Sequence, residues 1–320
     1  MTYGSGRGRT AVVAVGGNSL IIDNDHQAIP DQARAAAETV RHIMELIDSG
    51  WNVVLTHGNG PQVGFILRRS ELALGEVPPV SMEYAGADTQ GAIGFMFQQA
   101  FINEFRRRGS ERKAVTLVTQ VVVDQQDPAF RKPSKPVGSF MDKETAEQIA
   151  NTQGWVVGED SGRGWRRMVP SPKPQKIIES SAITHLMNSE FVVIACGGGG
   201  IPVVEEPDGV YKGVEAVIDK DLTSSLLAQD IKADLFLITT GVEKVAINYG
   251  TPKEKWLEHM TLAEARQYSE QGHFGEGSMA PKVRAMMAYV EATDGRAIIT
   301  NPENIGRAVN GEAGTHIVQK

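Results

Sequence analysis

Short runs of apolar, mostly β-branched residues recur along the chain, and each predicts a buried strand. The runs occupy residues 11–15, 51–56, 114–124, 191–195, 233–240 and 296–300. Between them, residues 31–50 and 85–107 have helical patterns, and Gly50 is a stop signal for the first helix. The apolar face of that helix consists of Val40, Ile43, Met44 and Ile47. This alternation predicts an α/β fold with a mainly parallel sheet that helices cover on both faces.

Three of the predicted strands end in glycine-containing loops. These loops are Gly16-Gly17-Asn18, Gly58-Asn59-Gly60 and the four consecutive glycines Gly197 to Gly200. Glycine lowers stability unless the position needs a positive φ or the close approach of another group. In open parallel sheets, ligands bind beyond the carboxyl ends of the strands, where backbone N–H groups can meet an anion. The loops therefore predict an anion site at this edge of the sheet.

Residues 125–176 interrupt the pattern. They contain six of the fifteen prolines and nine Lys or Arg against six Asp or Glu, in a chain whose formal net charge is −7. Residues 154–169 resemble a hairpin that turns at Asp160-Ser161-Gly162. One interpretation is that these residues form a surface insertion that has no function. The other, which the local positive charge favours, is a lid that closes over an anionic substrate.

Composition narrows the class of protein. The net charge of −7 over 320 residues argues against a general nucleic-acid binder, and no apolar stretch is long enough to span a membrane. The single cysteine, Cys196, excludes an internal disulfide framework, and the N-terminal sequence is not typical of a secretory signal. We therefore expect a cytoplasmic protein with neither a nucleic-acid nor a membrane partner. Gly-Lys does not occur, so a Walker A loop is absent, and no histidines have zinc-ligand spacing.

Two lysines lie where they could meet a phosphate. Lys220 stands between Asp219 and Asp221, and these carboxylates should keep it charged and fix its direction. They could also reach a Mg²⁺ ion that a nucleotide carries. Lys282 follows Gly275 and Gly277 in the first turns of a predicted helix. Either lysine alone is more often a solvated surface residue, so the residues by themselves indicate a phosphate-handling α/β protein and no more.

Seven motifs together resemble the carbamate kinases, a branch of the amino acid kinase family. They run in order from residue 13 to about residue 310: VAVGGNSL, THGNGPQVG, DPAFRKPSKPVGSF, PSPKPQKIIE, ACGGGGIPVV, EAVIDKDLTS and GSMAPKVRA. The resemblance implies a three-layer α/β/α sandwich formed by one domain, residues 1–320, with residues 125–176 as an inserted, protruding lid. It also implies a homodimer, a role in arginine metabolism, and reversible Mg²⁺-dependent phosphoryl transfer between ATP and carbamate. The family commonly makes ATP from carbamoyl phosphate and ADP.

The resemblance also implies roles for individual residues. It assigns catalysis to Lys135, Lys220, Asp221 and Lys282. It assigns phosphate or substrate binding to Gly16, Gly17, Asn18, Gly58, Asn59, Gly60, Gly198 and Gly199. The nucleotide side consists of Asp219, Lys220, Gly277 and Lys282, with Mg²⁺ carried by ATP or ADP and no protein ligand assigned to it.

Three other functions remain open from the sequence. A different amino acid kinase could phosphorylate a larger carboxylate such as acetylglutamate or aspartate. A variant that makes carbamoyl phosphate for biosynthesis would share all these residues. A non-catalytic nucleotide-binding regulator is a third possibility, although the lysines argue against it.

Overall fold

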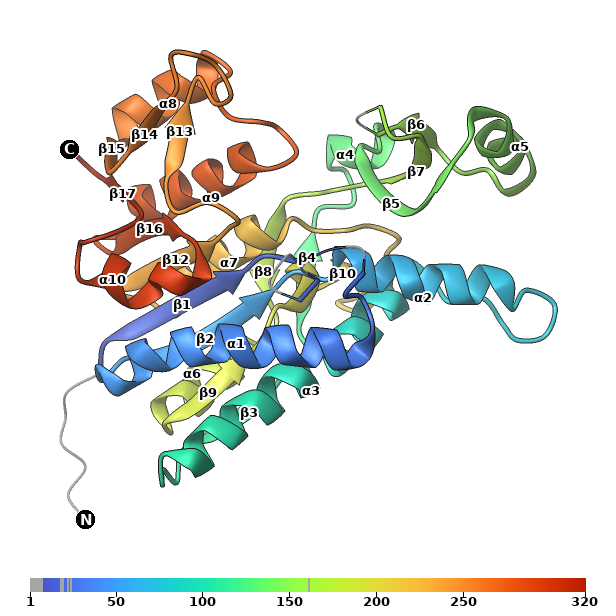
Figure 1. Ribbon diagram of the computed structural model, residues 1–320. Coiled ribbons are helices and arrows are strands. Elements are labelled where there is room, and N and C mark those ends of the chain that lie inside the picture. Colours follow the sequence, from blue (N-terminus) through green and yellow to red (C-terminus); the bar gives the residue numbers. More distant parts are fainter. Residues whose placement is uncertain (1–7, 18–19, 22, 24, 161) are drawn as a thin grey trace.

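The main sheet of the computed structural model, which describes all residues except 1–7, 18–19, 22, 24 and 161, has eight strands (Figure 1). Their order is β15-β17-β16-β12-β1-β2-β9-β3. The bounds are β1 Thr10–Val15, β2 Asn52–His57, β3 Lys113–Thr116, β9 Phe191–Ile194, β12 Leu235–Thr239, β15 His259–Thr261, β16 Arg296–Thr300 and β17 Thr315–Val318. All neighbours pair parallel except β16 and β17, which pair antiparallel. The expected mainly parallel sheet is confirmed.

Helices cover both faces of this sheet. Successive residues of β1 point to opposite faces, so Ala11 and Val13 enter one core while Val12 and Ala14 enter the other. The first core is completed by α1 (Ile29–Asp48), α3 (Met82–Arg107) and α10 (Ile305–Val309). The second is completed by α6 (Ser180–Asn188), α7 (Lys220–Asp230), α8 (Leu262–Glu270) and α9 (Met279–Ala292). The three-layer α/β/α sandwich is therefore confirmed.

Helix α1 matches its sequence pattern closely. Its four expected apolar residues, Val40, Ile43, Met44 and Ile47, are all buried. The helix begins at Ile29 with a proline in the first turn, where the missing N–H costs nothing. It ends at Asp48, and Gly50 follows with φ +84°, a conformation that favours glycine.

The expected single strand over residues 114–124 is wrong. The chain leaves the main sheet after β3 and enters β4 (Gln120–Val123), which belongs to a four-stranded sheet of order β11-β10-β4-β8. The other strands of this sheet are β8 Pro174–Ile177, β10 Ile201–Glu205 and β11 Tyr211–Gly213. Between the two strands, the backbone N–H of Thr119 donates to the side-chain oxygen of Gln90 in α3 at 2.7 Å and not to a neighbouring strand.

The predicted lid segment, residues 125–176, contains a sheet of its own. Strands β5 (Lys135–Met141), β7 (Trp165–Val169) and β6 (Val157–Glu159) pair antiparallel in that order. With α5 (Lys143–Gln153) they project away from the main sheet, and α4 (Pro128–Arg131) lies near their base (Figure 1). The expected hairpin is β6–β7, although Ser161 of its turn lies outside the described residues.

The C-terminal end of the lid segment reaches the body of the protein. Residues 174–176 lie in β8, which pairs with β4 in the four-stranded sheet. The remaining elements are α2 Gly60–Leu72, β13 Val245–Ile247, β14 Lys255–Leu257 and the 3₁₀ turns Gly197–Gly199 and Pro302–Asn304. Among the described helices, none is long and apolar enough to cross a membrane.

Candidate active site

The three glycine loops meet at one edge of the main sheet, because β1, β2 and β9 are adjacent and parallel. A Cβ atom added to Gly58 would lie 3.0 Å from the backbone nitrogen of Gly17. One added to Gly198 would lie 2.1 Å from Nδ2 of Asn59. The predicted phosphate-binding loops are thus in mutual contact, while Asn18 lies outside the described residues.

The four consecutive glycines pack against the protein itself. Gly198, Gly199 and Gly200 have φ values of +68°, +97° and +90°, which favour glycine. A Cβ on Gly199 would lie 2.3 Å from the carbonyl oxygen of Ile218, and one on Gly200 would lie 2.2 Å from the Val121 side chain. Close packing between loops is therefore a sufficient reason for glycine at these positions.

A cluster of lysines and carboxylates lies at the N-terminus of α7, around the buried Asp221. Asp221 is 3% exposed, and its two oxygens lie 2.8 Å from Nζ of Lys220 and 3.0 Å from Nζ of Lys282. Asp219 caps the helix by accepting from the backbone N–H of Asp221 at 2.9 Å. Its other oxygen accepts from Nζ of Lys135, on β5 of the lid segment, at 3.2 Å. The structure brings all four predicted catalytic residues together with Asp219.

The charges of this cluster do not balance. Three lysines face two carboxylates, which leaves one net positive charge for an incoming anion. Burial alone would raise the pKa of Asp221, but the charges of Lys220 and Lys282 outweigh it and hold that pKa at about 2. Burial lowers the pKa of Lys220, and the charge of Asp221 opposes this shift. Of the two flanking carboxylates, only Asp221 contacts Lys220, and its charge partly offsets the cost of burying the ammonium group, while Asp219 pairs with Lys135.

A cavity of about 820 Å³ opens between the glycine loops, α2 and strand β5. The predicted residues that line it are Asn59, Gly60, Lys135, Gly198 and Gly277. The first residues of α2 also line it, and a helix N-terminus with free N–H groups favours an anion. The other described site residues are not among its lining residues: Gly16, Gly17, Gly58, Gly199, Asp219, Lys220, Asp221 and Lys282.

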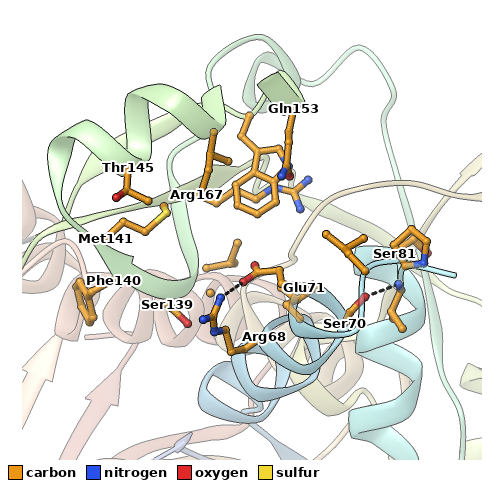
Figure 2. Close-up of a pocket in the computed structure, with 18 of the residues that line it drawn as sticks. Arg68, Ser70, Glu71, Ser81, Ser139, Phe140, Met141, Thr145, Gln153 and Arg167 are labelled. Atoms are coloured by element: carbon orange, nitrogen blue, oxygen red, sulfur yellow. Dashed lines mark hydrogen bonds and ion pairs between the residues drawn. The ribbon is translucent and has the colours of Figure 1, made fainter. Parts of the chain in front are cut away.

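A second cavity of about 830 Å³ lies between α2 and the lid segment (Figure 2). Arg68 and Glu71 of α2, paired at 3.0 Å, face Met141, Thr145 and Arg167 of the lid segment across it. None of the predicted site residues that the structure describes lines this cavity. Because Lys135 of the lysine cluster and residues of two glycine loops line the first cavity, that cavity is the candidate active site.

Two residues near the site were missed from the sequence. Arg166 lines the first cavity, where its Nε donates to the carbonyl oxygen of Gly138 at 3.1 Å. His57, the last residue of β2, is 1% exposed and stacks on Phe97 of α3. Burial lowers the pKa of His57 to about 4, and the charge of Lys220 acts in the same direction. The signal for Arg166 was the basic run after Trp165; His57 had none beyond its place at a strand end.

Comparisons with known proteins agree with this geometry. The model of the amino acid kinase family matches residues 9–301. A carbamate kinase of Pyrococcus furiosus is 48% identical over 313 residues, covering 97% of this chain and 99% of the relative. One of Thermococcus kodakarensis is 47% identical over 98% of this chain and 100% of the relative.

A solved structure supports the same assignment. Carbamate kinase from Giardia lamblia bound to AMP-PNP superposes with a TM-score of 0.92 at 41% identity, covering 98% of this chain and 99% of that one. The resemblance in the motifs is thereby confirmed. The chain belongs to the amino acid kinase family and, within it, to the carbamate kinases.

Proposed function

We propose that this enzyme transfers a phosphoryl group reversibly between ATP and carbamate, and that in the cell it makes ATP from carbamoyl phosphate and ADP. The observation that carries the proposal is the cluster of Lys135, Lys220 and Lys282 around Asp219 and Asp221, beside three converging glycine loops. The carbamate kinases that match this chain over nearly its whole length support the same activity.

The transfer is direct and in line, with no covalent enzyme intermediate. Carbamate already carries an oxyanion, so the reaction needs no general base, and catalysis consists of positioning and charge neutralisation. The three lysines supply that neutralisation as charge moves between donor and acceptor oxygens. Asp221 holds Lys220 and Lys282, while Asp219 holds Lys135 and so connects the lid segment to the cluster.

The glycine loops orient the phosphoryl group. Backbone N–H groups of Gly16, Gly17 and Gly60 bind its oxygens together with the amide of Asn59, and Gly198 forms the neighbouring wall of the cavity. The N–H of Gly58 already donates to the carbonyl oxygen of Val15 at 3.0 Å, so Gly58 contributes through its close packing against Gly17. The start of α9, with Gly277 and Lys282, lies on the nucleotide side. The lid segment closes over the substrates and excludes water.

Mg²⁺ enters with the nucleotide phosphates. Asp219 and Asp221, the carboxylates nearest the lysines, already accept from helix N–H groups or ammonium groups. Among the described residues, no group of three or more His, Cys, Asp or Glu forms a metal cluster. The bound ion would neutralise phosphate charge, and the residues that lie close enough to assist are the two aspartates.

A cytoplasmic homodimer is the proposed state of the enzyme. Helix α3 exposes Phe95 (61%) and Ile102 (36%), which a second copy could cover. Sedimentation equilibrium would test this, since a monomer at micromolar concentration would contradict it.

The activity is tested by ATP formation from ADP, Mg²⁺ and carbamoyl phosphate, with a luciferase signal. Native protein should make ATP, and Lys282→Ala should make almost none. Acetylglutamate and aspartate, tested with ATP as phosphoryl donor, distinguish the larger-carboxylate kinases. Folded native protein that binds nucleotide without turnover would support the regulator instead.

A further inference from the structure

Two consecutive polar residues of α3, Thr89 and Gln90, are buried beside the glycine loops. Each is 1% exposed, although neither lines the cavity nor contacts the lysines. A buried polar side chain is costly unless hydrogen bonds satisfy it. Its bonds therefore show what the side chain holds in place.

The amide of Gln90 joins α3 to Gly197, the first of the four consecutive glycines, and to Thr119 between β3 and β4. Its Nε2 donates to the carbonyl oxygens of Thr119 and Gly197, both at 3.1 Å. Its Oε1 accepts from the backbone N–H of Thr119 at 2.7 Å, which fixes the orientation of the amide. Thr119 in turn accepts from the backbone N–H groups of Cys196 at 3.1 Å and Ile201 at 2.9 Å, on either side of the loop.

The hydroxyl of Thr89 orients the cavity residue Asn59. Thr89 Oγ1 donates its one proton to the carbonyl oxygen of Gly86 at 2.7 Å and accepts from Nδ2 of Asn59 at 2.8 Å. The amide of Asn59 must therefore present its NH₂ group to the helix. Gly198 lies against the same amide, so one turn of α3 contacts both loops.

We infer that Thr89 and Gln90 are positioning residues for phosphoryl transfer. Because Thr89 and Gln90 are neighbours on α3, their hydrogen bonds fix the distance between the loop of Asn59 and the loop of Gly197. The inference rests on the proposed function, because in-line transfer requires groups on both loops to align with the lysines. A displacement of about 1 Å can cost a hundredfold in rate even when the altered residue does not touch substrate.

A purely structural role would give a different result. Loss of stability alone lowers the amount of folded enzyme and leaves kcat per folded molecule unchanged. Misplaced loops lower kcat and have little effect on nucleotide KM, because alignment is needed mainly in the transition state. Hydrogen exchange at the loop amides reports the same change without any activity.

The sharpest variant is Gln90→Glu, with Gln98→Glu as its matched control. Glutamate keeps an acceptor for Thr119 but places a carboxylate oxygen against the carbonyl oxygens of Thr119 and Gly197. Gln98 lies two turns further along α3, and its Oε1 accepts from the backbone N–H of Thr116, the last residue of β3, at 2.9 Å. We expect kcat of Gln90→Glu to fall about a hundredfold, with ADP KM changed less than about threefold. Gln98→Glu should retain its kcat.

Loop exchange is the second readout. Amides of residues 196–201 should exchange at least about tenfold faster in Gln90→Glu than in Gln98→Glu. The reason is that only Gln90→Glu loses the buried hydrogen bonds to Thr119 and Gly197. If native protein makes no ATP, the proposed function fails, and this comparison still decides whether α3 positions the loops.

Thr89 gives an independent pair of variants. Thr89→Val removes the acceptor for Asn59 at nearly constant shape, while Thr89→Ser restores it, so kcat should fall in the first and recover in the second. This pair decides the matter if Gln90→Glu does not fold. A kcat within about threefold of native in folded Gln90→Glu and Thr89→Val would overturn the inference. Loop exchange no faster in Gln90→Glu than in Gln98→Glu would also overturn it.

Discussion

Asp221 is the residue on which the charged cluster depends. It is almost fully buried, yet it stays ionised because an ammonium group lies against each of its oxygens. Removing one partner of a buried ion pair leaves a charge that neither water nor protein compensates, which is costly. Lys220 and Lys282 therefore both compensate the charge of Asp221, in addition to the role in charge neutralisation that we propose for them.

Replacing Lys220 or Lys282, the two lysines that contact Asp221, should abolish most of the activity. We expect Lys220→Ala and Lys282→Ala each to lower kcat at least about a hundredfold, the usual cost of one lost charge-stabilising contact in a transition state. The measurement is the initial rate of ATP formation. Lys244→Ala is the control, because Lys244 also forms a 2.8 Å ion pair, with Glu258 on the surface. A near-native rate in either cluster variant would remove that lysine from the mechanism.

Asp221→Asn should change the pH profile as well as the rate. The charge of Asp221 is what opposes the effect of burial on Lys220, so its loss lowers the pKa of Lys220 further. A lysine with a lower pKa loses its proton at lower pH, and activity should therefore decline at a lower pH than in the native enzyme. The measurement is kcat between pH 6 and 10 with Asp48→Asn, at a surface ion pair, as control. An unshifted alkaline limb would contradict this account of Lys220.

At the scale of elements, one short segment connects the lid segment to α7, the helix that carries Lys220 and Asp221. Residues 214–219 precede α7 and make three contacts with the lid segment: Glu215 with Arg167, the N–H of Val217 with the carbonyl oxygen of Pro170, and Asp219 with Lys135. Since Asp219 also caps α7, a movement of the lid reaches the first turn of that helix directly.

Loosening this connection should affect substrate capture more than chemistry. Glu215→Gln weakens the contact with Arg167, and we expect KM for carbamoyl phosphate to rise about threefold, the scale of an exposed ion pair, with a smaller change in kcat. Glu206→Gln, at an ion pair with Lys212 outside the lid, is the control. A large loss of kcat with unchanged KM would mean that Glu215 acts on the reacting groups and not through the lid.

The elements that were predicted well from the sequence are those in which burial determines the local spacing of apolar residues. Strand β1 lies inside the sheet, so every residue of it is apolar or buried, and α1 shows a single apolar face. The break between β3 and β4 has no local signal, because the partner of the intervening Thr119 N–H, the side chain of Gln90, lies about thirty residues away on another element. Motifs named the residues that the structure brings together, but they could not predict the contact between Lys135 and Asp219, which spans 84 residues and has no local signal.

At the scale of the whole molecule, the edge of the sheet that builds the site is also a source of acid sensitivity. His57 packs against Phe97 of α3 and against Gly197. Its burial and the positive charge of Lys220 both lower its pKa, so it stays neutral in the folded protein over a wide pH range. Its Nδ1 lies 3.1 Å from the carbonyl oxygen of Gly58, a contact that is consistent with a neutral ring that donates there.

The folded protein should therefore lose stability well above the pH at which its carboxylates titrate. The pKa of His57 falls from 6.5 to about 4 on folding, so between these values the unfolded chain binds a proton that the folded protein excludes. The free energy of unfolding should fall by about 3 kcal/mol over that range from this group alone, and the contribution is complete above pH 6.5. Asp221 adds a further loss only below pH 3.8, as its folded pKa of about 2 is approached.

Urea unfolding at fixed protein concentration, repeated between pH 7 and pH 4.5, measures the slope of the free energy of unfolding against pH. His57→Gln should make the slope shallower, because its side chain does not titrate, whereas exposed His185→Gln should leave the slope unchanged. Equal slopes in native protein and His57→Gln would mean that His57 is protonated in the folded protein. The loops around Gly58 and Gly197 would then have to open locally and let solvent reach the imidazole. The stability profile therefore tests how rigidly this edge of the sheet is held, independently of any turnover.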